Sequence, residues 1–355
     1  MRIRKGSKDF LLYDEEKQIY YLDDEQKVVD QVEKDHWKIV ARTLIKDWRL
    51  YLMLLPMLFV FFCWRYLPMY ELLAAFKLNL DGSIKVADYF YIGYNSFDTI
   101  LFGSYQAQFW NAFRNTFILS FYGLLFGFPV PIILALFFNE IKSKLYRSVL
   151  QVMTYLPKFI STVIITTLVW FLLSNKNSVE ANSQPGIVAR VLATLGIVSE
   201  ENAAAGMMNQ IQYFRPIYIL TGIWEGAGYG SIVYFAAIIA ISPTSYEAAQ
   251  IDGAGKMAQM RYVVLPSILS TIVIMLIVRI GSLLSIGYET VLLLQANGTM
   301  TNAEVVSTFA ISLKNSGVAG QALATIPELL NNLTSMILVI GANMISRKAT
   351  DTSLY

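Results

Sequence analysis

The stretch Glu247–Ser267, EAAQIDGAGKMAQMRYVVLPS, lies between two long apolar segments of a very hydrophobic chain. Its residues are mostly small, charged or glycine, and a Leu-Pro pair stands near its end. Ser or Asp before a helix caps free N–H groups, so SPTSYEAAQIDGAG predicts a short helix that includes Tyr246–Ile251. Gly253 and Gly255 then permit a turn that a residue with a Cβ would resist.

A second short helix is predicted over Lys256–Val264. We expect Leu265-Pro266 to end it, because the residue before a proline is pushed out of the helical region. The result would be a compact helix–turn–helix, residues 246–264, which we call the knob. An ordinary amphipathic loop resting on lipid headgroups is an equally good interpretation of these residues alone.

The composition indicates a membrane protein. Of 355 residues, 55% are hydrophobic and 15% are charged, whereas soluble domains carry about 25% charged residues. The net charge of +2 argues against a broad nucleic-acid surface. A single Cys63 and a single His36 exclude a disulfide within the chain and leave no Cys/His set for zinc.

Six segments are apolar enough to cross a bilayer core of about 30 Å as helices of roughly 20 residues. They are Tyr51–Pro68, Thr116–Phe138, Phe159–Leu173, Ile217–Ile241, Ile268–Leu294 and Leu329–Ile345. Pro129 and Pro131 would kink the second span. The third is short and can begin earlier, near Val149, with Pro157 inside it.

The placement of Lys and Arg predicts the orientation. Six spans bring three basic groups to one side, taken as cytoplasmic: Arg42, Lys46 and Arg49; Lys142, Lys144 and Arg147; Arg347 and Lys348. Both termini and the knob are then cytoplasmic. The segments Met69–Arg114, Ser174–Phe214 and Gln295–Ile326 would lie outside.

Residues 1–47 are predicted to be a separate N-terminal extension, followed by a transmembrane domain over residues 48–355 with its core at about 112–346. In the extension, DFLLYDEEKQIYYLDD has two short apolar runs around a polar segment, a weak hairpin signal. The apolar spacing from Val32 to Ile45 is typical of an amphipathic helix on the membrane surface. A solvated tail with a helical end is an equally good interpretation.

Catalytic motifs are absent from the sequence. A P-loop needs G-x-x-x-x-G-K-[ST], but around Gly255-Lys256 the first glycine is replaced by Gln250 and the hydroxyl residue by Met257. No HExxH, GxSxG or paired-carboxylate pattern appears either. We therefore expect no enzyme activity, no metal site and no cofactor on this chain, so that another chain would supply any energy.

Two charges fall inside predicted spans, where a charge costs about 2.5–3.5 kcal/mol. Counting at 1.5 Å per residue puts Glu225 and Arg279 both near the middle of the membrane. They could pair and hold spans four and five together, or either could face a polar substrate pathway. Trp224, Tyr229 and Tyr288 lie near them in sequence and could stack on a sugar, although packing is the commoner role of such aromatics.

The knob resembles the EAA motif of permease subunits of binding-protein-dependent ABC importers. E-A-A-x3-G-x9-[IV]-x-L-P fits Glu247-Ala248-Ala249, Gly253, Val263 and Leu265-Pro266 at every position, and Asp252–Ala254 also looks like the family. Segments such as FRNTFILSFYGLLFGFPVPIILALFFNEI, TYLPKFIS and ISRKATDTSLY are similar to the carbohydrate-uptake branch. They are closest to its lipoprotein- and polygalacturonan-associated oligosaccharide permeases. The resemblance covers about residues 48–355.

The resemblance implies an all-α ABC type I importer permease with six transmembrane helices in a bacterial cytoplasmic membrane. Its knob would dock on one of two cytoplasmic ATPase subunits that bind ATP and Mg²⁺. A second, homologous permease would complete the pathway, and an extracellular binding protein would deliver the sugar, expected to be an oligosaccharide. The residues with implied coupling roles are Tyr246, Glu247, Ala248, Ala249, Asp252, Gly253, Ala254, Leu265 and Pro266.

Other classes of function stay open at this point. The same importer fold could carry a non-sugar solute. A self-sufficient channel or secondary carrier would not need the knob and would be expected to show inverted repeats, of which none is clear. A membrane enzyme is disfavoured because the sequence lacks metal-ligand clusters and nucleophile–base motifs.

Overall fold

A computed structural model describes residues 2–3, 11–12, 45–76, 95–174, 185–316 and 320–350. The chain divides into two compact units, Met1–Glu71 and Leu72–Tyr355. The division follows contacts between residues, whereas the predicted boundary at residue 47 follows the change from polar to apolar sequence.

Two short strands pair among the described residues of the first unit. β1 (Arg2–Ile3) pairs antiparallel with β2 (Leu11–Leu12), with Arg2 opposite Leu12 and Ile3 opposite Leu11. The hairpin prediction placed Leu11 and Leu12 correctly in a strand but gave them the wrong partner, because they pair with the chain before them. The second apolar run of that prediction and most of the amphipathic segment lie outside the described residues.

The first predicted span begins in the same unit. α2 (Trp48–Phe61) continues into η2, a π-helical turn over Phe62–Tyr66, and then into η3, a 3-10 helix over Leu67–Phe76. Trp48–Tyr70 is long and apolar enough to cross a membrane, and none of the residues of α2 is buried. A helix that is apolar and exposed along its whole length suits a lipid or protein neighbour.

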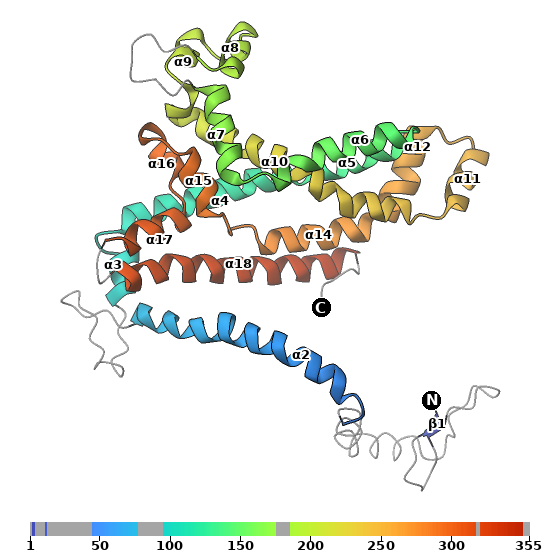
Figure 1. Ribbon diagram of the computed structural model, residues 1–355, viewed down its shortest axis with the longest axis horizontal. Helices are drawn as coiled ribbons and strands as arrows, with labels where there is room; N and C mark the ends of the chain where they lie inside the picture. Colours follow the sequence, from blue (N-terminus) through green and yellow to red (C-terminus); the bar gives the residue numbers. More distant parts are fainter. Residues whose placement is uncertain are drawn as a thin grey trace. The chain divides into compact units, whose positions relative to one another are not determined.

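The second unit is a bundle of helices (Figure 1). Its elements are, in order, α3 (Asn95–Leu101), α4 (Gln106–Gly127), α5 (Pro129–Glu140), α6 (Lys144–Tyr155), η5 (Leu156–Phe159), α7 (Thr162–Leu173), α8 (Ile187–Thr194), α9 (Glu200–Ala204), η6 (Met207–Asn209), α10 (Ile211–Ile239), α11 (Pro243–Ile251), α12 (Lys256–Gln259), η7 (Met260–Val264), α13 (Leu265–Ser267), α14 (Leu269–Gly281), α15 (Tyr288–Leu294), η8 (Asn297–Thr299), α16 (Met300–Ala303), α17 (Val306–Lys314) and α18 (Gly320–Thr350). Figure 1 shows α11 and α12 at one end of this unit and α17 at the other.

The described helices agree with up to six membrane spans. Three are long and apolar enough alone: Trp48–Tyr70, Gln106–Glu140 and Gly320–Lys348. Three more qualify as bent pairs: Lys144–Phe159 with Thr162–Leu173 at 101°, Ile211–Ile239 with Pro243–Ile251 at 70°, and Lys256–Ser267 with Leu269–Gly281 at 59°. The second span changes from α4 to α5 at the predicted prolines, and the third does begin before Phe159.

The prediction of one continuous fifth span over Ile268–Leu294 is wrong. α14 ends at Gly281, and α15 starts again only at Tyr288. The Ser282 hydroxyl donates to the carbonyl oxygen of Arg279 at 3.2 Å, so it satisfies a group that the ended helix leaves free. The break could not be seen in the sequence because the segment is apolar on both sides of it. Hydrophobicity alone does not show where an apolar segment stops being helical.

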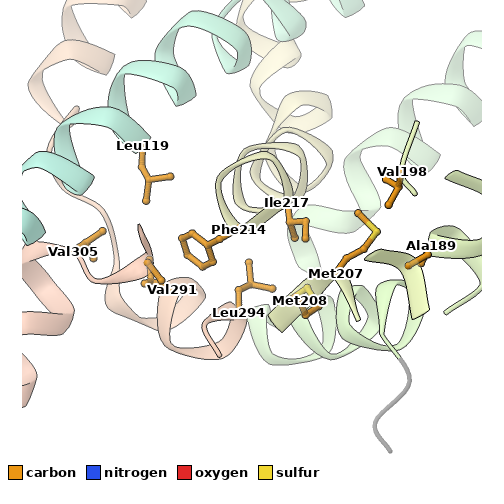
Figure 2. Packing of buried hydrophobic residues seen from close by; sticks show 12 residues of the cluster. Leu119, Ala189, Val198, Met207, Met208, Phe214, Ile217, Val291, Leu294 and Val305 are labelled. Atoms are coloured by element: carbon orange, nitrogen blue, oxygen red, sulfur yellow. The ribbon is translucent and has the colours of Figure 1, made fainter. Parts of the chain in front are cut away.

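Three clusters of buried apolar side chains form the core of the second unit. The largest joins α4, α8, α9, α10 and α15, with Phe214 of α10 directed toward Val291 and Leu294 of α15 (Figure 2). A second cluster joins α3, α4, α17 and α18. The third lies beside the knob and contains Ala135, Tyr234, Ile238, Val264 and Ile268.

α10 also makes one very close helix contact. A Cβ added at Gly228 would lie 2.0 Å from the carbonyl oxygen of Thr154 in α6, a distance that no side chain allows. Small residues permit such approaches in membrane helices. The glycine-rich run Trp224–Ser231 therefore permits close packing at Gly228, and α10 stays helical through it.

Candidate functional site

The knob consists of α11, a turn at Asp252–Gly255, and α12 with η7. α11 starts at Pro243 after Ser242, whose hydroxyl lies 2.7 Å from that of Thr244 and does not cap the helix. Gly253 has φ +77°, the left-handed region that favours glycine, while Gly255 has φ −68°. Of the two glycines, only Gly253 is required by its backbone conformation.

The side chains of the EAA segment lie mostly at the surface. Glu247, Ala248 and Asp252 are exposed, and Ala249 and Ala254 are half-buried. Two large apolar side chains of the knob are exposed with them, Ile251 at 86% and Met257 at 75%. Exposed apolar side chains grouped beside charged ones are typical of a surface that meets another protein.

The prediction that Leu265-Pro266 ends the second helix is wrong. Leu265 has φ −59° and ψ −45°, and the helix continues through Pro266 to Ser267. The preceding η7 is a π-helical turn, which changes the hydrogen-bond spacing just before the proline that has no N–H to donate. The chain bends instead at Ile268, where α14 departs at 59°.

Polar contacts connect the knob to the end of α5. Lys256 at the start of α12 forms an ion pair with Glu140, the last residue of α5. The side chain of Asn139, next to Glu140, is a polar neighbour of the Tyr246 hydroxyl of α11. The ring of Tyr246 also packs against the buried cluster around Ile238. The two helices of the knob are therefore each attached to the same helix end.

A cavity of about 490 Å³ lies among α4, α5, α10, α14 and the irregular segment before α15. The lining includes the glycines of two helices and the hydroxyls of Ser120, Ser282, Ser285 and Thr290. Its volume falls within the range of roughly 300–1,000 Å³ found for small-molecule sites. Its charged residues are Lys158, Glu225 and Arg279.

Glu225, at the middle of α10, forms its ion pair with Lys158. The Lys158 Nζ lies 2.8 Å from Glu225 Oε1, and the two side chains are 45% and 17% exposed. The predicted alternative of a Glu225–Arg279 pair is wrong, because Lys158 takes that place. No role for Lys158 was predicted from the sequence, since 67 residues separate it from Glu225, and it is the packing of η5 on α10 that brings the two side chains together.

Arg279 lies in the last turn of α14, two residues before the helix ends. It is exposed on the cavity, and its charge acts on Tyr218 of α10, as does that of Glu225. Within the described ranges, no carboxylate lies within ion-pair distance of its guanidinium. A cation in the last turn of a helix is favoured by the helix dipole.

The predicted aromatic residues do not line the cavity. Trp224, Tyr229 and Tyr288 are exposed, at 46%, 49% and 52%. Tyr229 meets Phe159 edge-on, with ring centroids 6.0 Å apart. Of the five predicted pathway residues, the structure brings Glu225 and Arg279 to one cavity and leaves the three aromatics elsewhere.

A polar clamp, Asn115, Arg215, Asn302 and Glu304, joins α4, α10 and the segment after α15. Asn115, fully buried, donates to the carbonyl oxygens of Thr301 (2.8 Å) and Glu304 (3.0 Å) and accepts from Arg215 (3.0 Å). Arg215 also donates to Asn302 at 3.3 Å. This clamp was not predicted from the sequence, where its only signal is an Arg and an Asn within apolar segments.

The carboxyl of Glu304 extends the clamp to Gln108, which donates to it at 2.9 Å. Burial raises the pKa of Glu304 above its ordinary value, and the hydrogen bond from Gln108 partly opposes that shift. Glu304 stands in the connection between α16 and α17, where no membrane span is indicated. Across the described ranges, no three His, Cys, Asp or Glu side chains gather as metal ligands.

Comparison with protein families gives one match. The model of the family described as "Binding-protein-dependent transport system inner membrane component" matches residues 99–341. That range begins in α3 and ends within α18, and it includes the knob and all the residues of the cavity.

Two curated relatives come from Bacillus subtilis (strain 168). Protein LplB is 31% identical over 314 residues, which is 88% of this chain and 92% of the relative. The polygalacturonan/rhamnogalacturonan transport system permease protein YteP is 32% identical over 324 residues, 91% of this chain and 95% of the relative.

Two solved structures are also similar, each with a TM-score of 0.74 and 38% identity over 88% of this chain and 99% of the other. One is a bacterial ABC transporter involved in the import of the acidic polysaccharide alginate. The other is the bacterial alginate ABC transporter in complex with an alginate pentasaccharide-bound periplasmic protein.

Proposed function

The chain belongs to the family of inner membrane components of binding-protein-dependent transport systems, and from this premise we propose that it conducts an oligosaccharide as half of an ABC importer's pathway. The observation that carries the proposal is the knob, with its exposed EAA segment and left-handed Gly253. The names of the relatives, which include a polygalacturonan permease and an alginate importer, support a sugar polymer fragment as the cargo.

In this proposal the knob is the coupling element. Glu247 makes a polar contact with an ATPase subunit, and the small residues Ala248 and Ala249 let the two surfaces approach closely. Gly253 holds the turn. The ATPases bind ATP and Mg²⁺ and hydrolyse the nucleotide, while this chain carries out no catalysis.

Movement of the knob would be transmitted to the cavity by the helices that begin or end at the knob. α10 enters it and α14 leaves it through the bend at Ile268, with Leu265-Pro266 inside the connecting helix. Movement of the knob would thus reach Glu225 and Arg279 from two sides. The aromatics Trp224, Tyr229 and Tyr288, exposed beside the cavity helices, are assigned to surfaces shared with a neighbouring subunit.

The partners follow from this arrangement. A second, homologous permease closes the pathway, two ATPase subunits engage the two knobs, and an extracellular binding protein delivers the cargo to the end opposite the knob. Both termini lie on the ATPase side of a bacterial cytoplasmic membrane. The crystal structure of a related transporter with a sugar-loaded periplasmic protein supports a partner of that kind.

The test is reconstitution of the full chain in liposomes with its partner permease, ATPase and binding protein. ATP hydrolysis and sugar uptake are measured with a panel of neutral and acidic oligosaccharides. We expect one class to stimulate both. Gly253→Pro and Glu247→Arg should uncouple hydrolysis from uptake while the complex stays in the membrane.

A matched pair at the same position separates backbone conformation from side-chain size. A Cβ at Gly253 would meet no atom within 4 Å, so only its φ opposes substitution. Asn tolerates the left-handed region and β-branched Val does not, so Gly253→Asn should retain most uptake and Gly253→Val should lose it. Normal uptake in the Pro, Arg and Val variants would contradict the coupling role.

A further inference from the structure

The charges of the cavity do not balance. Its lining carries two cations, Lys158 and Arg279, and one anion, Glu225. Because Lys158 and Glu225 are 2.8 Å apart, they neutralise each other. The cavity is left with the positive charge of Arg279, for which the described part of the chain supplies no carboxylate within 4.0 Å.

The ion pair also fixes which cation stays free. Glu225 is mostly covered, with 17% of its side chain exposed, and its Oε1 accepts a hydrogen bond from Lys158. Arg279 extends from the last turn of a different helix, and the segment that follows it, Ser282–Gly287, lines the same cavity with irregular backbone. Irregular backbone at membrane depth is tolerated where it lines a polar cavity.

The space beside Arg279 is suited to a sugar ring. On α10, a Cβ built at Gly222 or Gly226 would meet no heavy atom within 4 Å, so the helix surface there is open. Both glycines line the cavity, one helical turn apart, and Glu225 stands between them. The hydroxyls of Ser282, Ser285 and Thr290 give the walls hydrogen-bonding groups for sugar hydroxyls.

The free cation selects the chemistry of the ligand. A guanidinium offers a planar fork of donors that matches a carboxylate with two parallel hydrogen bonds. A neutral sugar would displace water from Arg279 without supplying a charge in return, and this costs free energy in a site surrounded by apolar helices. An anionic sugar would remove that cost and would satisfy the site.

We propose that this cavity binds an acidic oligosaccharide and that Arg279 contacts a sugar carboxylate there. The inference rests on the proposed importer function and adds the charge class of the cargo and the residue that recognises it. Lys158 and Glu225 are positioning residues, since their ion pair prevents Glu225 from neutralising Arg279.

The test uses the complete permease–ATPase complex in nanodiscs without the binding protein, so that only the membrane site is measured. The probes are fluorescently labelled trigalacturonate and the same trisaccharide with its carboxyls methyl-esterified, which removes the negative charges and adds one methyl group to each carboxyl. Binding is measured by thermophoresis at low and high salt. We expect the acid to bind at least about tenfold more tightly than the ester, as for a hydrogen bond to a charged group, and only the acid to weaken with salt.

Three variants are expected to change the preference for the acid in different directions. Arg279→Gln should remove the preference for the acid, whereas Arg279→Lys should keep part of it because the charge remains. Glu225→Gln should strengthen acid binding, because it frees Lys158 as a second cation. Thermal unfolding of each complex shows whether the variant is folded, and the Lys and Glu225 variants test the idea even if Arg279→Gln unfolds.

Equal affinities for acid and ester in the wild type, no binding of either, or an unchanged preference in folded Arg279→Gln would overturn the inference. None of these binding results decides whether the protein is an importer, because that function is tested separately by uptake. If the wild-type complex couples ATP hydrolysis to uptake of any oligosaccharide, the proposed function stands while this assignment falls. If no oligosaccharide is taken up by the intact complex, the proposed function is contradicted as well.

Discussion

Glu304 is a single carboxyl whose protonation is coupled to folding. Burial in the polar clamp raises its pKa in the folded protein above the value in the unfolded chain. The folded state therefore binds the proton more tightly, so this contribution to stability is present below the unfolded pKa, about 4.3, and is lost as the pH rises through the higher folded pKa.

We expect the wild-type melting temperature to fall with rising pH over that window more steeply than that of Glu304→Gln. The amide keeps the shape and the contact with Gln108 but cannot ionise. Differential scanning fluorimetry of the purified complex between pH 4 and pH 8 measures both profiles. Parallel profiles for the two proteins would show that the pKa of Glu304 does not differ between the folded and unfolded states.

The residues of the cavity show what a sequence can and cannot supply. Glu225 and Arg279 were recognised because a charge in an apolar segment needs a physical reason. The sequence left open whether they pair with each other or face a polar pathway. Glu225 instead pairs with Lys158, which comes from another element and whose approach cannot be counted along the chain. Gly253 was predicted correctly, since its turn depends only on local backbone conformation.

At the scale of elements, the crossing of α10 and α6 depends on Gly228. A methyl group at that position would overlap the Thr154 carbonyl, at 2.0 Å, so the two helices would have to separate. We expect Gly228→Ala to destabilise the folded protein by about 1–3 kcal/mol, the usual cost of overpacking.

The matched control for this prediction is Gly226→Ala, two residues earlier in the same helix, where the added methyl meets no atom within 4 Å. Thermal unfolding of both variants in one detergent separates packing from helix propensity, which is the same in both. Equal melting temperatures would mean that the helices can part at Gly228 without loss.

The ion pair Glu140–Lys256 connects two other elements, α5 and α12. Both side chains are partly exposed, at 34% and 66%, so the pair contributes little to stability. Its position between the knob and the end of a span suggests a mechanical role. We expect Glu140→Lys to lower uptake per ATP hydrolysed several-fold, with little change in melting temperature.

The charge-swapped double variant, Glu140→Lys with Lys256→Glu, tests this role because it restores opposite charges at the two positions. Recovery of coupled uptake in liposomes would assign the effect to the pair itself. A double variant as uncoupled as the single one would assign it to Glu140 alone and would contradict a connection through the ion pair.

The elements themselves were largely predictable. The spans were assigned to the right parts of the chain, and the breaks at prolines are local in sequence. Several helices begin earlier than predicted, the second span at Gln106 rather than Thr116 and the sixth at Gly320 rather than Leu329.

The break after Gly281 was not predictable, since Gly281 packs against Val339 of α18 and the helix ends where that contact and the Ser282 hydroxyl allow. That information lies in tertiary structure.

At the scale of the whole molecule, the chain is one component of an assembly. Its family consists of inner membrane components of transport systems, and α2 has no buried residue. We expect the tagged full chain, solubilised in mild detergent from its native host, to co-purify with a homologous permease and an ATPase. Recovery of the chain alone under conditions that preserve related complexes would favour a self-sufficient carrier.

The bend at Ile268 has a consequence for release of the cargo. α14 starts at the next residue, Leu269, and carries Arg279 near its far end, about 16 Å from Ile268 at 1.5 Å per residue. Treated as a rigid rod pivoting at Ile268, α14 displaces Arg279 by about 0.3 Å for each degree of tilt, by the same helix geometry. A tilt of about ten degrees would move the guanidinium by roughly the length of a hydrogen bond. A movement of α14 that opens the pathway would then also break the contact between Arg279 and the anion. Binding and release of the cargo would be controlled by the same helix.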